Sequence, residues 1–151
     1  MPKQPFKRVE KRLAGKAALR TDAATSARMG RIRQSGTAPE ITIRRAVSTL
    51  GLRYTVRNKD LPGSPDLANR SRRWAIFVHG CYWHRHEGCH KASTPRTNID
   101  FWLNKFSHNV ARDAAARVSL KRQGYRVLTF WQCECESGHG LTARLTRLAH
   151  S

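Results

Sequence analysis

Cysteines and histidines cluster in one short stretch of this sequence, with spacings that suit a metal ion. Cys81, His86 and Cys89 lie within nine residues, and Cys133 follows much further along the chain. Structural zinc is usually held by four sulfur or nitrogen ligands in a tetrahedron, often contributed by separate segments that the fold brings together. These residue types therefore predict a structural zinc site.

The spacing alone leaves some ligand positions open. Cys135 could replace Cys133, since residues two apart in a strand share one face. His84 and His90 are alternative nitrogen donors. Four cysteines could also form two disulfides, but the N-terminal segment lacks the continuous apolar stretch of a secretory signal. In a reducing compartment, a mixed Cys/His cluster indicates a metal.

A carboxylate and two histidines could together hydrolyse a phosphodiester bond. Asp66 follows a Gly-Ser-Pro turn and precedes an apolar run, so its carboxylate could project from a sheet end and hold Mg²⁺, which prefers oxygen ligands. His79 ends that run, and His84 stands five residues on. Mg²⁺ can polarise a phosphate while a histidine takes the proton of a water. Taken alone, Asp66 is more typical of a surface turn. Either histidine could equally well be a zinc ligand or an exposed loop residue.

These candidates must be positioned by a small α/β or α+β core. Thr37 and Glu40 match a capping box at a helix start. The long-helix aromatics Phe101, Trp102 and Phe106 are expected in the core. The hydrophobic pattern predicts a helix from Thr37 to Gly51, a strand over 52–56, a buried strand over 74–78, a long helix over 97–123 capped by Thr97, a buried strand over 125–131, and a short helix over 141–148. The predicted architecture is a small mixed sheet flanked by helices.

The charge balance points to a polyanionic partner. The chain has 151 residues, about one domain, and 29 Lys and Arg against ten Asp and Glu give it a net charge of +19. Such a surface attracts nucleic acid. No apolar run is long enough to span a membrane. Ten of the basic residues lie in residues 1–35, so we expect a flexible basic arm over 1–35 that orders on DNA and a folded domain over 36–151.

Several motifs of this chain are distinctive in combination. They lie at Leu61–Asp66, Phe77–His86, Thr94–Thr97, Phe101–Trp102, Lys105, Asn109–Asp113, Gly124–Leu128 and Trp131–Cys133. Across roughly residues 25 to 135, the chain resembles the bacterial very-short-patch mismatch repair endonucleases. The run His-Gly-Cys-aromatic-Trp-His is the most specific part of this resemblance.

The resemblance implies a restriction-endonuclease-like core with a structural zinc. It also implies an enzyme that nicks one strand at a T:G mismatch left by 5-methylcytosine deamination, using Mg²⁺. The Mg²⁺ would be held by Asp66 and the backbone carbonyl of Val78, with His84 as the general base. The other implied residues are the catalytic His79, Glu40 and Asp113, the zinc ligands Cys81, His86, Cys89 and Cys133, and the DNA-contacting Tyr82, Trp83 and Met29.

Two other functions fit part of the sequence. A zinc-stabilised DNA-binding module without catalysis needs the charge, the zinc and the aromatic pair, but not Asp66, His79 and His84 together. A basic RNA-binding protein of ribosomal type fits the charge alone. We expect a monomer in the bacterial cytoplasm without membrane association. Its expected partner is double-stranded DNA with a T:G mismatch, and other mismatch repair proteins are further candidates.

Overall fold

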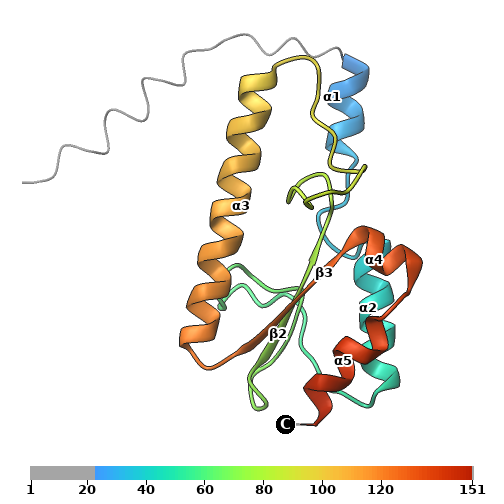
Figure 1. The fold of residues 1–151 in the computed structure, drawn as a ribbon, viewed down its shortest axis with the longest axis vertical. Helices are drawn as coiled ribbons and strands as arrows, with labels where there is room; N and C mark the ends of the chain where they lie inside the picture. Colours follow the sequence, from blue (N-terminus) through green and yellow to red (C-terminus); the bar gives the residue numbers. More distant parts are fainter. Residues whose placement is uncertain (1–22, 151) are drawn as a thin grey trace, which may run out of the picture.

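The computed structural model describes residues 23–150, which fold into a small mixed sheet with helices on both sides (Figure 1). β1 runs antiparallel to β2, and β2 runs parallel to β3, in the order β1-β2-β3. The predicted mixed sheet flanked by helices is therefore confirmed. The elements are α1 (Ala23–Gly30), α2 (Ala38–Thr49), β1 (Leu67–Asn69), β2 (Trp74–His79), α3 (Ile99–Arg122), β3 (Arg126–Trp131), α4 (Gln132–Ser137) and α5 (Leu141–Ala149).

The central strand β2 is buried on both faces, as its unbroken apolar run predicted. Successive side chains of a strand point to opposite faces. Trp74 and Ile76 pack in one hydrophobic cluster with residues of α2 and α5. Ala75 and Phe77 pack in a second cluster with residues of α3. Figure 1 shows α3 on one side of the sheet and α2, α4 and α5 on the other.

Helix α2 begins as the sequence predicted. The side chain of Thr37 accepts a hydrogen bond from the backbone N–H of Glu40, which is the N-cap contact. The Glu40 carboxylate reaches back and accepts a hydrogen bond of 2.8 Å from the backbone N–H of Gly36. Ile43 and Val47 are fully buried. The cap thus orients a helix that packs one face on the sheet and holds the buried Glu40 near its end.

The predicted strand over 52–56 is wrong. The structure contains only an isolated bridge there, between Thr55 and Ala68. The only strand next to this segment is β1, which is three residues long and cannot support a longer pairing. β1 itself has no apolar repeat long enough to be predicted. Of the alternating apolar residues, Leu52 is nevertheless buried, whereas Val56 is 40% exposed.

The long helix also differs from expectation in its start and its aromatics. The N-cap of α3 is Asn98 and not Thr97. Asn98 adopts a left-handed conformation (φ 53°), which is not part of the right-handed helix that follows. Asn tolerates this conformation better than most residues. Of the three aromatics expected in the core, only Phe106 is buried, at 3% exposure, whereas Phe101 is 43% exposed. Trp102 is half-buried.

The predicted basic arm lies largely outside the described residues. Its described part contains helix α1, in which no residue is buried, and Met29 is half-exposed on it. Figure 1 shows α1 at the same end of the molecule as the start of α3. None of the helices in the described part of the chain combines the length and the apolar character needed to cross a membrane.

Candidate active site and metal centre

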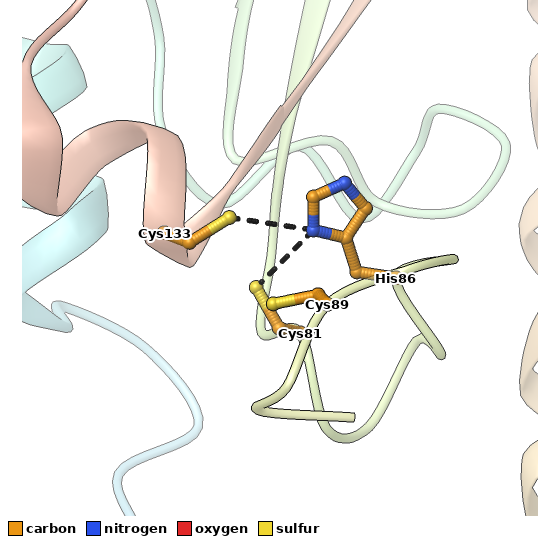
Figure 2. Close-up of side chains that lie close together, drawn as sticks. All are labelled: Cys81, His86, Cys89 and Cys133. Atoms are coloured by element: carbon orange, nitrogen blue, oxygen red, sulfur yellow. Dashed lines mark hydrogen bonds between the residues drawn. The ribbon is translucent and has the colours of Figure 1, made fainter. Parts of the chain in front are cut away.

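Four predicted metal ligands converge in the structure. Cys81, His86 and Cys89 come from the turns that follow β2, and Cys133 comes from the first turn of α4 (Figure 2). Their ligand atoms all lie within 4.8 Å of one another. Cys135, the alternative ligand, instead packs in the hydrophobic core on the α2 side of the sheet. The four cysteines are free thiols, so the disulfide alternative is not realised.

The spacing of these ligand atoms fits a tetrahedral zinc site. Nδ1 of His86 lies 3.6 Å from Sγ of Cys81 and 3.3 Å from Sγ of Cys133. Zn–S bonds of about 2.3 Å and Zn–N bonds of about 2.1 Å would place neighbouring sulfur and nitrogen ligands about 3.6 Å apart. The His86 ring stacks on Trp131, with centroids 4.3 Å apart, which fixes its orientation. Three thiols and one imidazole are thus arranged to hold one metal ion.

Asp66 lies at the point where the pairing of β1 with β2 stops. The last antiparallel pair is Leu67 with Ile76. Pro65 has no N–H to continue the ladder, and its carbonyl accepts a hydrogen bond of 2.9 Å from Asn58. The N–H of Val78 is therefore left for the Asp66 carboxylate, which accepts a hydrogen bond of 2.7 Å from it. The end of the ladder fixes an acidic side chain beside β2.

A glycine holds the turn before Asp66 against helix α3. Gly63 has a φ of +72°, and a Cβ built on it would lie 2.5 Å from the Cβ of Ala116. Any other residue would therefore push the turn away from the helix. Asp113 lies three residues before Ala116 on the same helix, so this close contact also fixes the distance between the turn and Asp113.

The Asp66 carboxyl is a poor acid in this position. Burial raises its pKa from 3.8 to about 6, and the nearby negative charge of Glu40 acts in the same direction. The hydrogen bond from Val78 and the charges of His84 and Arg44 oppose this shift without cancelling it. Asp66 and the neighbouring Glu40 together offer negatively charged oxygen atoms, which are the ligands that Mg²⁺ prefers.

Asp66→Asn should therefore stabilise the protein in buffer without added Mg²⁺. Because the pKa of Asp66 is higher in the folded protein than in the unfolded chain, its protonation stabilises the fold below pH 3.8. This stabilisation is lost as the pH rises to about 6. At pH 7.5 the amide should gain up to about 3 kcal/mol over the carboxylate, and the gain should shrink toward pH 4. Melting temperatures at both pH values test this, with the exposed Asp100→Asn as control. An equal gain at both pH values would contradict the explanation.

His84 and Asp113 form a hydrogen-bonded pair between the loop that follows β2 and helix α3. Nδ1 of His84 lies 2.5 Å from Oδ2 of Asp113. Burial works to raise the pKa of Asp113, but the hydrogen bond with His84 and the charges of His84, His79 and Arg112 outweigh it and hold that pKa below its usual value. An ionised Asp113 favours an N–H on Nδ1 and leaves Nε2 of His84 as a proton acceptor.

His79 stacks on His84 and completes this cluster. The two rings are parallel within 5°, and their centroids are 3.9 Å apart. Burial, together with the charge of His84, lowers the pKa of His79 to about 4, against the opposing charge of Asp113. His79 is therefore neutral at pH 7. All three predicted residues of this cluster lie together, and the charge of His84 also acts on Asp66, so the two carboxylates and two histidines belong to one site.

Tyr82 and Trp83 form an aromatic shelf with residues of α3. The Tyr82 ring lies 5.2 Å from that of Phe106, and the Trp83 ring 5.9 Å from that of Trp102, between centroids. Both Tyr82 and Trp83 remain half-exposed. The shelf is thus mounted on the helix next to the catalytic candidates and is open to a ligand.

Three α3 residues for which the sequence predicted no functional role lie against this shelf. Lys105 places its Nζ 5.2 Å from the centroid of the Trp83 ring, and Asn109 donates a hydrogen bond of 3.1 Å to the Trp83 carbonyl. Trp102 was assigned to the core. The spacing of residues 102, 105 and 109 by three and four places them on one helix face, and this pattern could have revealed them.

Comparison with known proteins identifies the family. The family model described as DNA mismatch endonuclease Vsr matches residues 17–91. The type II nicking enzyme V.XorIIP of Xanthomonas oryzae is 40% identical over 120 residues, covering 80% of this chain and 88% of the relative. This chain belongs to the Vsr family. The resemblance found in the sequence is thereby confirmed.

Two further relatives match the same share of the chain. The DNA mismatch endonuclease Vsr of Escherichia coli K12 is 37% identical, covering 80% of this chain and 76% of its own length. The type II nicking enzyme V.NmeAIP of Neisseria meningitidis is 34% identical, covering 80% and 85%. The segment matched by the Vsr family model contains Glu40, Asp66, His79 and His84 and ends before α3.

Proposed function

We propose that this protein is a DNA mismatch endonuclease that nicks one strand of a duplex at a T:G mismatch, by Mg²⁺-dependent phosphodiester hydrolysis. The observation that carries the proposal is the joint placement of Asp66 and the His84–Asp113 pair at the end of β2. Membership of a family whose members are named mismatch endonucleases and nicking enzymes supports it. The net charge of +19 supports duplex DNA as the substrate.

The residues around Asp66 fit a bound Mg²⁺. Asp66 supplies the carboxylate and Val78 its backbone carbonyl, and the neighbouring Glu40 adds negative charge. When bound, Mg²⁺ would polarise the scissile phosphate and favour attack by water. Val78 has no side-chain hydroxyl, so only its backbone carbonyl would help to hold the ion. In the proposed restriction-endonuclease-like core, Asp66 and Val78 would hold the ion at the end of strand β2.

His84 is the proposed general base. Its Nδ1 is held by Asp113, so Nε2 takes a proton from the attacking water. Asp113 stabilises the imidazolium that results and keeps the ring in one orientation. His79 stacks on the ring as a neutral side chain and limits its rotation without adding a positive charge.

The Cys/His centre is the proposed structural zinc site. Its four protein ligands leave no coordination position for water. The loop that carries three of these ligands also carries Tyr82, Trp83 and His84. A zinc ion there would fix the proposed base and the aromatic shelf relative to α4.

The experiment that tests the proposal is nicking of end-labelled duplexes. T:G and matched T:A duplexes are incubated with the zinc-loaded protein, with and without Mg²⁺. A single-strand nick that requires both the mismatch and Mg²⁺ is expected. Binding to the mismatch without any nicking would favour a zinc-stabilised DNA-binding module, and preference for RNA in competition would favour an RNA-binding protein. We expect the protein to act as a monomer on bacterial cytoplasmic DNA, with other mismatch repair proteins as candidate partners.

Trp83→Ala should lose mismatch preference but keep the capacity to nick. The proposal assigns Tyr82 and Trp83 to a wedge in the opened base stack, with Met29 approaching from the other groove. A mismatch is more easily opened than a matched pair, and loss of one stacked ring removes about 1–3 kcal/mol. The ratio of T:G to T:A binding should fall about tenfold. Phe101→Ala, which removes an exposed aromatic of α3, serves as the matched control. An unchanged ratio for Trp83→Ala would exclude it from recognition.

Deletion of residues 1–22 should flatten the salt dependence of DNA binding. This segment carries seven Lys and Arg against two acids. Each phosphate contact that is lost should lower the slope of log affinity against log salt by about 0.9. Nicking at low salt should persist, because the candidate active site lies outside this segment. Binding isotherms at several salt concentrations measure the slope. An unchanged slope would show that residues 1–22 do not contact DNA.

A further inference from the structure

His79, His84 and Asp113 form a second group of metal-ligating side chains, separate from the Cys/His centre. One donor atom from each residue lies within 4.8 Å of the others. The donor set is two imidazoles and one carboxylate. Such nitrogen-rich sets favour divalent transition ions such as Ni²⁺, Cu²⁺ and Zn²⁺, whereas Mg²⁺ favours oxygen ligands. The group therefore differs in chemistry from the oxygen ligands around Asp66.

We propose that this group is a regulatory site for a divalent transition ion, and that an ion bound there blocks nicking. The inhibitory part rests on the proposed function, because it takes His84 as the general base. An ion on a ring nitrogen of His84 would occupy a lone pair or displace the hydrogen bond that prepares it. An ion on Asp113 would remove the carboxylate that lies 2.5 Å from Nδ1 of His84. Either contact disables proton transfer.

The ring geometry makes an ion at this site exchangeable. The lone pair of an imidazole nitrogen lies in the plane of its ring, and the two rings lie in parallel planes with centroids 3.9 Å apart. One ion cannot lie in both planes, so one ring must turn out of the stack when the ion binds. The Cys/His centre offers four ligands around His86 without such a change. The second site should therefore be weaker than the structural one.

Neighbouring cations weaken the site further. Arg117 acts on His79, and Arg112 acts on Asp113. Their positive charges oppose a bound cation, while the ionised Asp113 attracts it. The carboxylates of Asp66, on which the charge of His84 acts, and of Glu40 add attraction. This balance suits a site that fills when free transition metal rises and empties when it falls, instead of one that holds a resident ion.

Metal titration of the zinc-loaded protein tests the site directly. Ni²⁺ is added to protein that carries one zinc, and binding is followed by calorimetry and by metal analysis after dialysis. One further ion per chain should bind. Asp113→Asn, a conservative change, and His79→Ala should each weaken it by about 10- to 100-fold or more. His108→Ala removes an exposed histidine of α3 outside the group and should leave the affinity unchanged.

Two binding results would overturn the proposal. One is the absence of a second ion at micromolar metal, and the other is equal affinity in the wild type, Asp113→Asn and His79→Ala. Melting temperatures show whether the variants are folded, and Asp113→Asn decides the question if His79→Ala, whose side chain is buried, fails to fold. Retention of the zinc in every variant confirms that Ni²⁺ has not entered the thiol site.

Nicking measured in parallel tests the regulation. With Mg²⁺ present, Ni²⁺ should inhibit nicking of a T:G duplex at the concentrations that fill the second site. A weak chelator that leaves the structural zinc in place should restore activity. Binding of Ni²⁺ without inhibition would overturn the regulatory role. A protein that never nicks with Mg²⁺, yet binds Ni²⁺ through these residues, would disprove the proposed function and leave the metal site standing.

Discussion

Asp66→Ala should bind a T:G duplex about as well as the wild type and show no detectable nicking. Asp66 is the carboxylate fixed beside β2 by the Val78 N–H, and in the proposed mechanism it supplies the charge that would hold Mg²⁺ against the scissile phosphate. No neutral side chain nearby can replace that charge. Single-turnover nicking in Mg²⁺, with binding measured separately in Ca²⁺, separates chemistry from affinity.

His84→Ala should nick about 10² to 10⁴ times more slowly, the usual effect of losing a general base. Asp66→Ala should be more severe, because the metal ligand itself is lost. Asp113→Asn should fall between the wild type and His84→Ala, since His84 would keep its position but lose the carboxylate that selects its tautomer.

Exposed residues of the same types provide the controls for these variants. Asp60→Ala and His108→Ala remove side chains outside the candidate site and should nick at the wild-type rate. Near-normal nicking by His84→Ala would transfer the role of base to His79, which stacks on it. Normal nicking by both histidine variants would exclude a histidine mechanism.

Cys89→Ala should release the zinc and lower the melting temperature by roughly 10 °C or more. Structural zinc contributes about 10–16 kcal/mol in small zinc-binding peptides, and a loss of even about 3 kcal/mol shifts a domain of this size by roughly 10 °C. Residues 80–98 form turns without a helix or strand. We therefore expect their order to depend on a metal held by the Cys/His centre. Metal analysis and thermal melting measure both effects.

Cys135→Ala is the matched control for the zinc prediction. Cys135 is buried in the hydrophobic core and lies two residues from the ligand Cys133. Its removal should leave one zinc per chain and produce only the smaller destabilisation of a shortened core side chain. A wild-type protein purified without chelator that contains no zinc would contradict the assignment of the metal.

The loop over residues 81–89 links the predictions for His84→Ala and Cys89→Ala. His84 lies between Cys81 and His86 in sequence, so loss of zinc should also displace the proposed base from Asp113. Cys89→Ala is therefore expected to nick more slowly even though Cys89 does not lie in the proposed catalytic group. Excess zinc should restore neither the stability nor the activity of this variant, because its fourth ligand is missing.

Local sequence was sufficient for the elements that local forces decide. The Thr37 cap predicted the start of α2, because the side chain and the backbone N–H that it satisfies lie three residues apart. The apolar run of β2 predicted a strand buried on both faces. The thiols and imidazoles predicted a metal site because few other arrangements use them together. The strand predicted over 52–56 failed because a strand exists only where a partner of sufficient length lies beside it.

Tertiary structure decided which side chains meet. The spacing of Cys133 and Cys135 left either of them as the fourth zinc ligand. This alternative assumed a strand, in which residues two apart share a face. The chain instead begins α4 at Gln132, and in a helix residues two apart point in nearly opposite directions, about 200° apart. Cys133 therefore faces His86, and Cys135 faces the core.

The catalytic candidates show the same division between residue type and placement. The sequence alone identified a carboxylate and histidines capable of hydrolysis, and only a family resemblance connected Asp113 with them. The pairing of His84 with Asp113 joins residues 29 positions apart, and no periodicity of either segment encodes it. It depends on how closely α3 packs on the sheet, which Gly63 permits by lying against Ala116. Residue chemistry is a property of the sequence, whereas the distance between two such groups is set by the packing of elements far apart along the chain.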